Sequence, residues 1–196
     1  MLVVMLGVFE INPEHKFYHL TAMIKEGMNT SIQTSMDTPI QETLTAEHFK
    51  AEETQSHEGF EMQTFAPQVF AKLRRSLDIT EEEYRNSLCS DGDYLQFVSN
   101  SKSKADFFIT NDKRFFLKTQ SRREVSFLLS NLQAYMDHLE KYPHSLMVRF
   151  LGKSNSDKHN FESTHPKKYL QCTSRLSPSQ LGSAVAPCDP LKGKQL

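Results

Sequence analysis

The apolar residues between positions 64 and 152 recur at two different spacings, one typical of helices and the other of strands. A helix is expected after Pro67, because the first helical turn tolerates proline and apolar residues then follow at helical spacing. A capping-box pattern from Thr80 to Glu83 predicts a second, shorter helix that ends near Leu88.

Alternating apolar and polar residues predict a sheet in the centre of this region. The expected strands cover residues 94–98, 105–109 and 114–119. A turn cluster that includes Asn111 and Asp112 separates the last two strands, which predicts a β-hairpin. In the last strand, alternation places Lys118 on the same face as Phe116 and on the opposite face from Leu117.

A long helix is expected to follow this sheet. Ser121 and Glu124 form a second capping box, and apolar residues then repeat every three or four positions until Pro143 ends the helix. The repeating residues are Val125, Leu128, Leu129, Leu132, Tyr135, Met136 and Leu139. A further strand is expected over residues 145–151, closed by Gly152.

These elements predict an α+β fold in which an antiparallel sheet carries the long helix on one face. The sequence also gives a set of expected core residues, taken from the apolar positions of each element. They are Phe70, Leu73, Leu95, Phe97, Phe108, Leu117, Leu128, Leu132, Tyr135 and Leu146.

The two flanking regions differ from this centre. Residues 1–63 are acidic and poorly patterned, so we expect a partly disordered amino-terminal extension with a flexible connector over residues 29–58. Within this extension only a short strand near Gly7–Ile11 and a helix near Glu14–Lys25 are expected. Residues 153–196 are rich in Ser, Lys, Pro and Asn and are expected to form a disordered tail. The central domain is therefore assigned to residues 64–152.

Charge and cysteine content exclude some functions. The formal net charge is −1, and no region is basic enough to require a nucleic acid partner. The 3 cysteines have no paired spacing, which favours free thiols in a reducing compartment such as the cytoplasm. The apolar start of the chain is too short to span a bilayer and lacks the features of a secretory signal. No metal site is predicted, because His15 and His19 have helical spacing but no third ligand nearby.

Lys118 and Glu124 are the first candidates for chemistry. Kinases hold ATP phosphates with a lysine on a strand and fix that lysine with a glutamate on a helix, and this lysine and glutamate occupy such elements. A solvent-facing lysine at a sheet and a glutamate that only caps a helix explain the same residues, and spacing alone favours those structural explanations.

The polar segment 99–104 is the second candidate. Phosphate-covering loops normally contain glycine, because backbone amides must approach the phosphate closely, and this segment has none. Its candidate residues are Ser101, Lys102, Ser103 and Lys104. The two lysines can neutralise phosphate, whereas a solvated hairpin turn is the structural alternative.

Residues 65–152 resemble the amino-terminal lobe of the phosphatidylinositol phosphate kinases. The stretches that carry the resemblance are "FAPQVFAKLRRSLDITEEEYRNSLC", "SKADFFITNDKRFFLKTQ" and "HSLMVRFLG". The resemblance implies that Lys118 corresponds to the ATP-binding lysine of the family's "IKT" strand, and that Glu124 is its acidic partner. It also implies that residues 99–104 stand where the family has its phosphate-covering loop, although the glycines are absent.

The resemblance implies ATP and magnesium as cofactors of the family, and none for this chain by itself. The family's catalytic lobe, with its "D.KGS" and "DYSLL" motifs, is missing from the sequence after Gly152. We therefore expect a non-catalytic scaffold or regulator that binds active phosphatidylinositol phosphate kinases in the cytoplasm, or at a phosphoinositide-containing plasma membrane. The alternatives are an ATP-dependent lipid kinase activity that belongs to the full-length family member, and an unstable truncation product without function.

Overall fold

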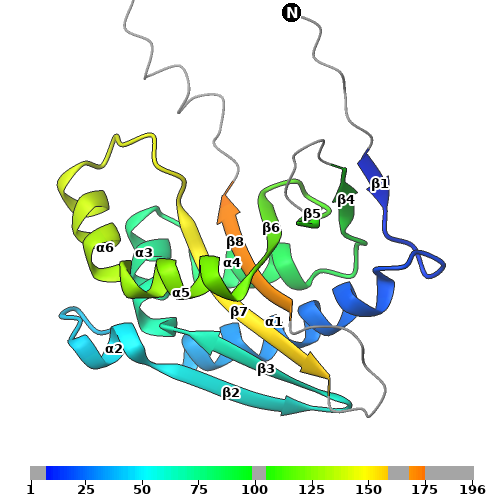
Figure 1. The fold of residues 1–196 in the computed structure, drawn as a ribbon, viewed down its shortest axis with the longest axis horizontal. Helices are drawn as coiled ribbons and strands as arrows, with labels where there is room; N and C mark the ends of the chain where they lie inside the picture. Colours follow the sequence, from blue (N-terminus) through cyan, green and yellow to red (C-terminus); the bar gives the residue numbers. More distant parts are fainter. Residues whose placement is uncertain (1–7, 99–104, 159–167, 175–196) are drawn as a thin grey trace, which may run out of the picture.

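A computed structural model describes residues 8–98, 105–158 and 168–174, which fold into one antiparallel sheet surrounded by helices (Figure 1). The strands are β1 (Val8–Glu10), β2 (Glu52–His57), β3 (Phe60–Phe65), β4 (Leu95–Phe97), β5 (Phe107–Ile109), β6 (Phe115–Gln120), β7 (Phe150–Lys158) and β8 (Lys168–Ser174). Their order across the sheet is β1-β4-β5-β6-β8-β7-β3-β2. The helices are α1 (Tyr18–Asp37), α2 (Ala46–Lys50), α3 (Pro67–Ser76), α4 (Glu81–Cys89), α5 (Arg122–Ser130) and α6 (Leu132–Lys141). The α+β class and the antiparallel sheet are confirmed.

Two hydrophobic clusters hold these elements together. The larger one lies between one face of the sheet and helices α1 and α4, where Ile24, Leu88, Phe108 and Leu117 are each at most 1% exposed. The second joins α3 to α6, with Phe70 and Leu132 at its centre. Figure 1 shows α1 behind the sheet and α5 in front of it, so the front face is the one on which α5 begins.

Most of the expected core residues are buried. Phe70, Leu73, Phe108, Leu117, Leu132 and Tyr135 are confirmed as core. Leu95, Phe97 and Leu128 are only half-buried. Leu146 is 75% exposed, so its assignment to the core is wrong. The reason is that residues 143–149 form a loop rather than the expected strand, and β7 begins at Phe150.

The expected long helix is interrupted at Asn131, which ends α5 and begins α6. The side-chain amide of Asn131 donates to the backbone carbonyl oxygen of Phe127 at 2.8 Å. The hydroxyl of Ser130 donates to the backbone carbonyl oxygen of Ser126, also at 2.8 Å. Such polar side chains compete with the helical backbone and favour a break. The apolar repeat continues across this break, which is why the pattern predicts one helix.

The prediction of a flexible connector at residues 29–58 is wrong for most of these residues. Helix α1 continues to Asp37, and β2 covers Glu52–His57. Gly27 of α1 faces Met62 of β3 so closely that an added Cβ would lie 2.5 Å from the Met62 Cε atom. The absence of a side chain at Gly27 therefore lets the helix pack directly on the sheet.

The expectation of a disordered tail from residue 153 also needs correction. Strand β7 runs through Gly152 to Lys158, and β8 inserts between β6 and β7 in the middle of the sheet. The buried residues Leu170 and Cys172 of β8 join the larger cluster, so this strand contributes to the core. The rest of the expected tail lies outside the described residues, and the three-part domain division stays a prediction.

Candidate functional site

Lys118 lies on β6, close to the middle of the sheet. Its neighbours across the strands are Phe107 on β5 and Gln171 on β8. Burial alternates along β6 as expected, with Leu117 and Thr119 buried and Lys118 half-buried on the other face. The ammonium nitrogen lies 6.0 Å from the centre of the Phe107 ring. Lys118 therefore stands on the front face of the sheet, partly open to solvent.

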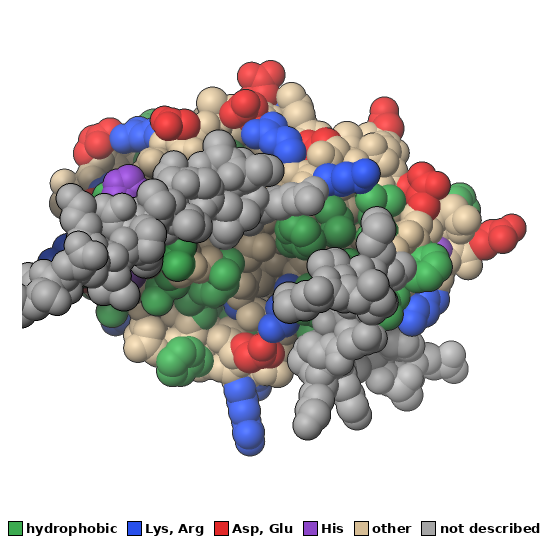
Figure 2. Space-filling model, turned by 90° about the horizontal axis from the view of Figure 1, so that it is seen from above, with side chains coloured by type: hydrophobic (Ala, Val, Ile, Leu, Met, Phe, Trp, Pro, Cys, Tyr) green, Lys and Arg blue, Asp and Glu red, His purple; other side chains and the backbone are tan. Residues whose placement is uncertain are grey.

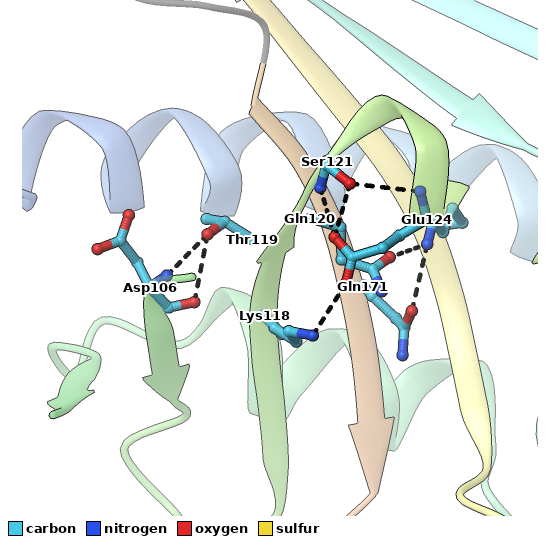
Figure 3. Close-up of polar contacts among 8 residues, drawn as sticks. Asp106, Lys118, Thr119, Gln120, Ser121, Glu124 and Gln171 are labelled. Carbon is cyan, nitrogen blue, oxygen red and sulfur yellow. Dashed lines mark hydrogen bonds and ion pairs between the residues drawn. The ribbon is translucent and has the colours of Figure 1, made fainter. Parts of the chain in front are cut away.

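Glu124, in the first turn of α5, contacts Lys118 directly. Its Oε1 atom lies 3.2 Å from the Lys118 Nζ atom. Helix α5 begins two residues after β6 ends, so the chain needs only a short turn to bring the two side chains together (Figure 3). The structure thus joins the two residues that the sequence singled out, and their role towards ATP stays a prediction.

The same glutamate caps its helix. The Oε2 atom of Glu124 accepts hydrogen bonds from the backbone N–H and the hydroxyl of Ser121, both at 2.8 Å. The pKa of Glu124 is below its usual value, mainly because the Ser121 N–H donates to it, with further help from the Ser121 hydroxyl and Lys118. The capping and pairing explanations are therefore both satisfied, one by each carboxylate oxygen.

Lys153, which the sequence analysis assigns to the disordered tail, also belongs to this site. Lys153 of β7 is 2% exposed, and its amine donates to the side-chain oxygens of Gln120 and, at 3.2 Å, of Gln171. Strand pairing places Lys118 opposite Gln171 and Gln171 opposite Lys153, so the three form a row across β6, β8 and β7. Figure 3 shows Lys118 and Gln171 on their neighbouring strands. Burial lowers the pKa of Lys153 to about 7, with Glu124 opposing the shift and Lys118 adding to it.

A sequence signal for this row does exist. Residues 169–173 alternate between apolar and polar, with Leu170 and Cys172 on one side and Gln171 on the other, as a strand requires. Read as a strand, this segment needs partners, and β6 and β7 supply them. The polar composition of the surrounding residues favours disorder, so this short strand pattern is not recognised from the sequence.

The other candidate residues, Ser101, Lys102, Ser103 and Lys104, lie outside the described residues. Their segment joins β4 to β5, which pair as a hairpin. Their assignment as a phosphate-covering loop stays a prediction.

A magnesium ion at this site would need oxygen ligands, and Glu124 is the carboxylate beside Lys118. Both oxygens of Glu124 already accept hydrogen bonds, one from Lys118 and one from Ser121. Across the described ranges, no group of three or more His, Cys, Asp or Glu side chains is placed to hold a metal ion. Glu124 as it stands therefore does not fit a magnesium ion, and phosphate binding by Lys118 stays a prediction.

The surface beyond the site carries exposed apolar residues. The most exposed are Phe127 of α5, at 73%, and Leu146 of the loop before β7, at 75%. Figure 2 views the end of the molecule where this loop lies and shows hydrophobic side chains in several groups around a hollow. In the part of the chain that the structure describes, no helix is long and apolar enough to cross a bilayer.

A half-buried lysine in the middle of an antiparallel sheet, held by a glutamate of the next helix, is the arrangement with which kinase-like lobes face nucleotide phosphates. Comparison with known proteins defines the class further. The family described as Phosphatidylinositol-4-phosphate 5-Kinase matches residues 88–169. The chain is 50% identical over 147 residues to Phosphatidylinositol 4-phosphate 5-kinase-like protein 1 of Homo sapiens, and 47% identical over 147 residues to the protein of that name from Mus musculus.

These two alignments cover 75% and 74% of this chain but only 37% of each relative, so the chain spans little more than a third of their length. Phosphatidylinositol 4-phosphate 5-kinase 3 of Arabidopsis thaliana is 33% identical over 93 residues, which is 47% of this chain and 13% of that protein. The chain belongs to the phosphatidylinositol phosphate kinase family and corresponds to its amino-terminal portion.

Proposed function

We propose that this chain acts in phosphoinositide metabolism as a non-catalytic scaffold or regulator of active phosphatidylinositol 4-phosphate 5-kinases. The observation that supports the phosphate-binding part of this role is the Lys118–Glu124 pair on the front face of the sheet, at 3.2 Å and partly open to solvent. In this role Lys118 binds phosphate oxygens, of a nucleotide or of a phosphoinositide headgroup, and the chain associates with an active kinase in the cytoplasm or at the membrane surface.

The chemistry of the pair favours binding over catalysis. Phosphoryl transfer needs metal ions held by acidic groups and a residue that positions the acceptor hydroxyl, besides a cation on the phosphates. Lys118 supplies only the cation, and Glu124 is committed to Lys118 and to the cap of α5. An anion can replace Glu124 as the partner of Lys118, because a single exposed ion pair contributes only about 0–1 kcal/mol.

The direct test of the non-catalytic role is an assay of the purified chain with ATP, magnesium ions and vesicles that contain phosphatidylinositol 4-phosphate. No bisphosphate is expected. Turnover that disappears in Lys118→Met but persists in Lys50→Met, an exposed lysine of α2, would overturn the proposal.

The test of the scaffold role is co-precipitation of the chain with an active phosphatidylinositol 4-phosphate 5-kinase. Association should survive Lys118→Met, because that residue faces phosphate rather than a protein partner. Failure of the wild-type chain to associate at micromolar concentration would remove the scaffold role.

The second candidate function is the lipid kinase reaction itself, in which phosphatidylinositol 4-phosphate is phosphorylated on the 5-hydroxyl with ATP. The similarity to relatives named 5-kinases favours it for a longer family member. A chain that adds the remaining portion of the human relative to this one should then show lipid-dependent ATP turnover, and Lys118→Met should abolish that turnover.

A further inference from the structure

Lys153 is a buried amine whose hydrogen-bond partners are neutral. Its side chain donates to the amide oxygens of Gln120 and Gln171, and within the described ranges it forms no ion pair. An ammonium ion at such a position is costly, because burial removes its hydration without supplying an opposite charge. A neutral amine, in contrast, has two N–H donors, which match the two amide oxygens.

The charges that face Lys153 come from two elements. Glu124 of α5 favours its protonated form, and Lys118 of β6 disfavours it, while burial dominates and brings the pKa to about 7. The β8 neighbour, Gln171, is uncharged. Close to neutral pH the neutral and protonated forms of the Lys153 amine are therefore both populated, and one additional nearby charge can shift this equilibrium.

The geometry places this amine beside the candidate phosphate site. Lys118 and Lys153 lie on the same face, two strands apart, with Gln171 between them. Neighbouring strands are about 4.8 Å apart, so the two backbone positions are roughly 10 Å from each other. Lys118 contacts Glu124 in the first turn of α5, and Lys153 contacts Gln120 just before that helix. A chain of two or three phosphates is long enough to approach both amines.

We propose that Lys153 is a second cationic binding group for a di- or triphosphate that is bound at Lys118. A phosphate oxygen takes the place of the Gln120 amide oxygen, and the half-buried Gln120 side chain turns aside to admit it. The neutral amine gains one proton from solvent and becomes an ammonium ion paired with the phosphate. This inference rests on the proposed function, since it requires that Lys118 bind phosphate.

Proton uptake gives the proposal a signature that a purely structural lysine lacks. Inorganic tripolyphosphate is titrated into the full chain at pH 8. Calorimetry in two buffers with different ionisation enthalpies then counts the protons exchanged. The ligand itself is partly protonated at this pH and releases protons on binding, so the contribution of Lys153 is counted as the difference between the wild-type chain and Lys153→Met. This difference should be an uptake of about one proton per ligand, because the amine is mostly neutral at this pH before binding and charged after it.

Three variants separate the outcomes. Lys153→Met should abolish the uptake and weaken binding about tenfold, as loss of one charged hydrogen bond does. Lys50→Met should change neither quantity. If Lys153→Met binds with unchanged affinity and uptake while Lys118→Met does not bind, the inference falls and the proposed function stands. If the wild-type chain does not bind tripolyphosphate, the inference falls together with the binding of nucleotide phosphates at Lys118, whereas the scaffold role is decided by the co-precipitation test.

A measurement on the wild-type chain guards against misfolding of the variant. Acetylation of amines at pH 8, followed by mass spectrometry of peptides, reports how reactive each lysine is. Tripolyphosphate should slow the acetylation of Lys153 at least tenfold and leave that of Lys50 unchanged. Equal acetylation of Lys153 with and without tripolyphosphate would overturn the inference.

Discussion

Two ion pairs of this molecule, Arg74–Glu81 and Lys118–Glu124, each join a cation to a glutamate but differ in their exposure to solvent. Arg74 of α3 donates to both oxygens of Glu81 of α4, at 2.5 and 2.7 Å, and the two side chains are only 6% and 12% exposed. Lys118 makes one contact with Glu124 at 3.2 Å, and these side chains are 30% and 47% exposed. The first pair is enclosed, whereas the second is open to solvent on one side.

The partners of each cation explain the difference. The guanidinium of Arg74 also donates to the carbonyl oxygen of Leu151 at 2.6 Å and lies 4.5 Å from the centre of the Tyr84 ring. It thereby ties α3, α4 and β7 together, and no ligand can replace its partners without unfolding that junction. Lys118 can exchange Glu124 for another anion at low cost, which suits a binding group. Burial from solvent thus distinguishes the structural pair Arg74–Glu81 from the candidate binding pair Lys118–Glu124.

Removal of the enclosed cation should have the largest effect on stability. Arg74→Met leaves Glu81 buried without its counter-ion, and we expect the free energy of unfolding in urea to fall by about 3–5 kcal/mol. The matched control is Arg75→Met, whose pair with Glu42 is 51% and 79% exposed, and which should cost only about 0–1 kcal/mol. Equal losses in the two variants would contradict the comparison.

The buried amine of Lys153 should make stability depend on pH. Its pKa in the folded protein, about 7, lies below the ordinary value of 10.5, so between these values the unfolded chain binds more protons than the folded one. Stability from this residue therefore rises with pH across that interval, by up to about 1.4 kcal/mol per pH unit. Unfolding of the wild-type chain and Lys153→Met should be compared at pH 7, 8 and 9, and parallel curves would refute the shift.

Loss of the cap at α5 should have an intermediate effect. In Ser121→Ala the Glu124 carboxylate loses one hydroxyl donor, and the backbone N–H of Glu124 loses its acceptor. We expect a loss of about 1 kcal/mol in the free energy of unfolding. Ser126→Ala, an exposed position inside the same helix, serves as the control and should leave stability within about 0.5 kcal/mol of the wild type. A result in which both variants behave alike would mean that the cap does not hold the helix end.

The exposed cation should matter least for stability and most for binding. Lys118→Met should change the free energy of unfolding by less than about 1 kcal/mol, because its pair with Glu124 is screened by solvent. The same variant should lose tripolyphosphate binding by at least about tenfold. A large loss of stability with intact binding would show that Lys118 is a structural residue like Arg74.

Local signals account for the parts of the site that the sequence predicts correctly. The alternation along β6 and the capping box of Ser121 and Glu124 lie within ten residues of each other, so strand, turn and helix start are all encoded nearby. The approach of Glu124 to Lys118 follows from the short connection alone.

Long-range contacts account for the parts that it does not predict. The buried face of α1 includes Gly27, Ser31 and Ser35, which do not stand out as apolar, and its packing depends on Met62 of a distant strand. Lys153 pairs with Gln171 of β8 and contacts Gln120 of β6, and an isolated sequence window gives no sign of these neighbours. Burial that depends on a distant partner is not visible in local periodicity.

The position of β8 has a consequence for the order of assembly. This strand comes last among the described strands in the sequence, yet it pairs with β6 on one side and β7 on the other. A nascent polypeptide that has emerged only as far as residue 158 therefore holds two half-sheets, each with an unsatisfied edge that can pair with other chains. Closure of the gap by residues 168–174 is a late, non-local event, and such events slow folding. Chaperone dependence during synthesis should accordingly end only when this strand leaves the ribosome.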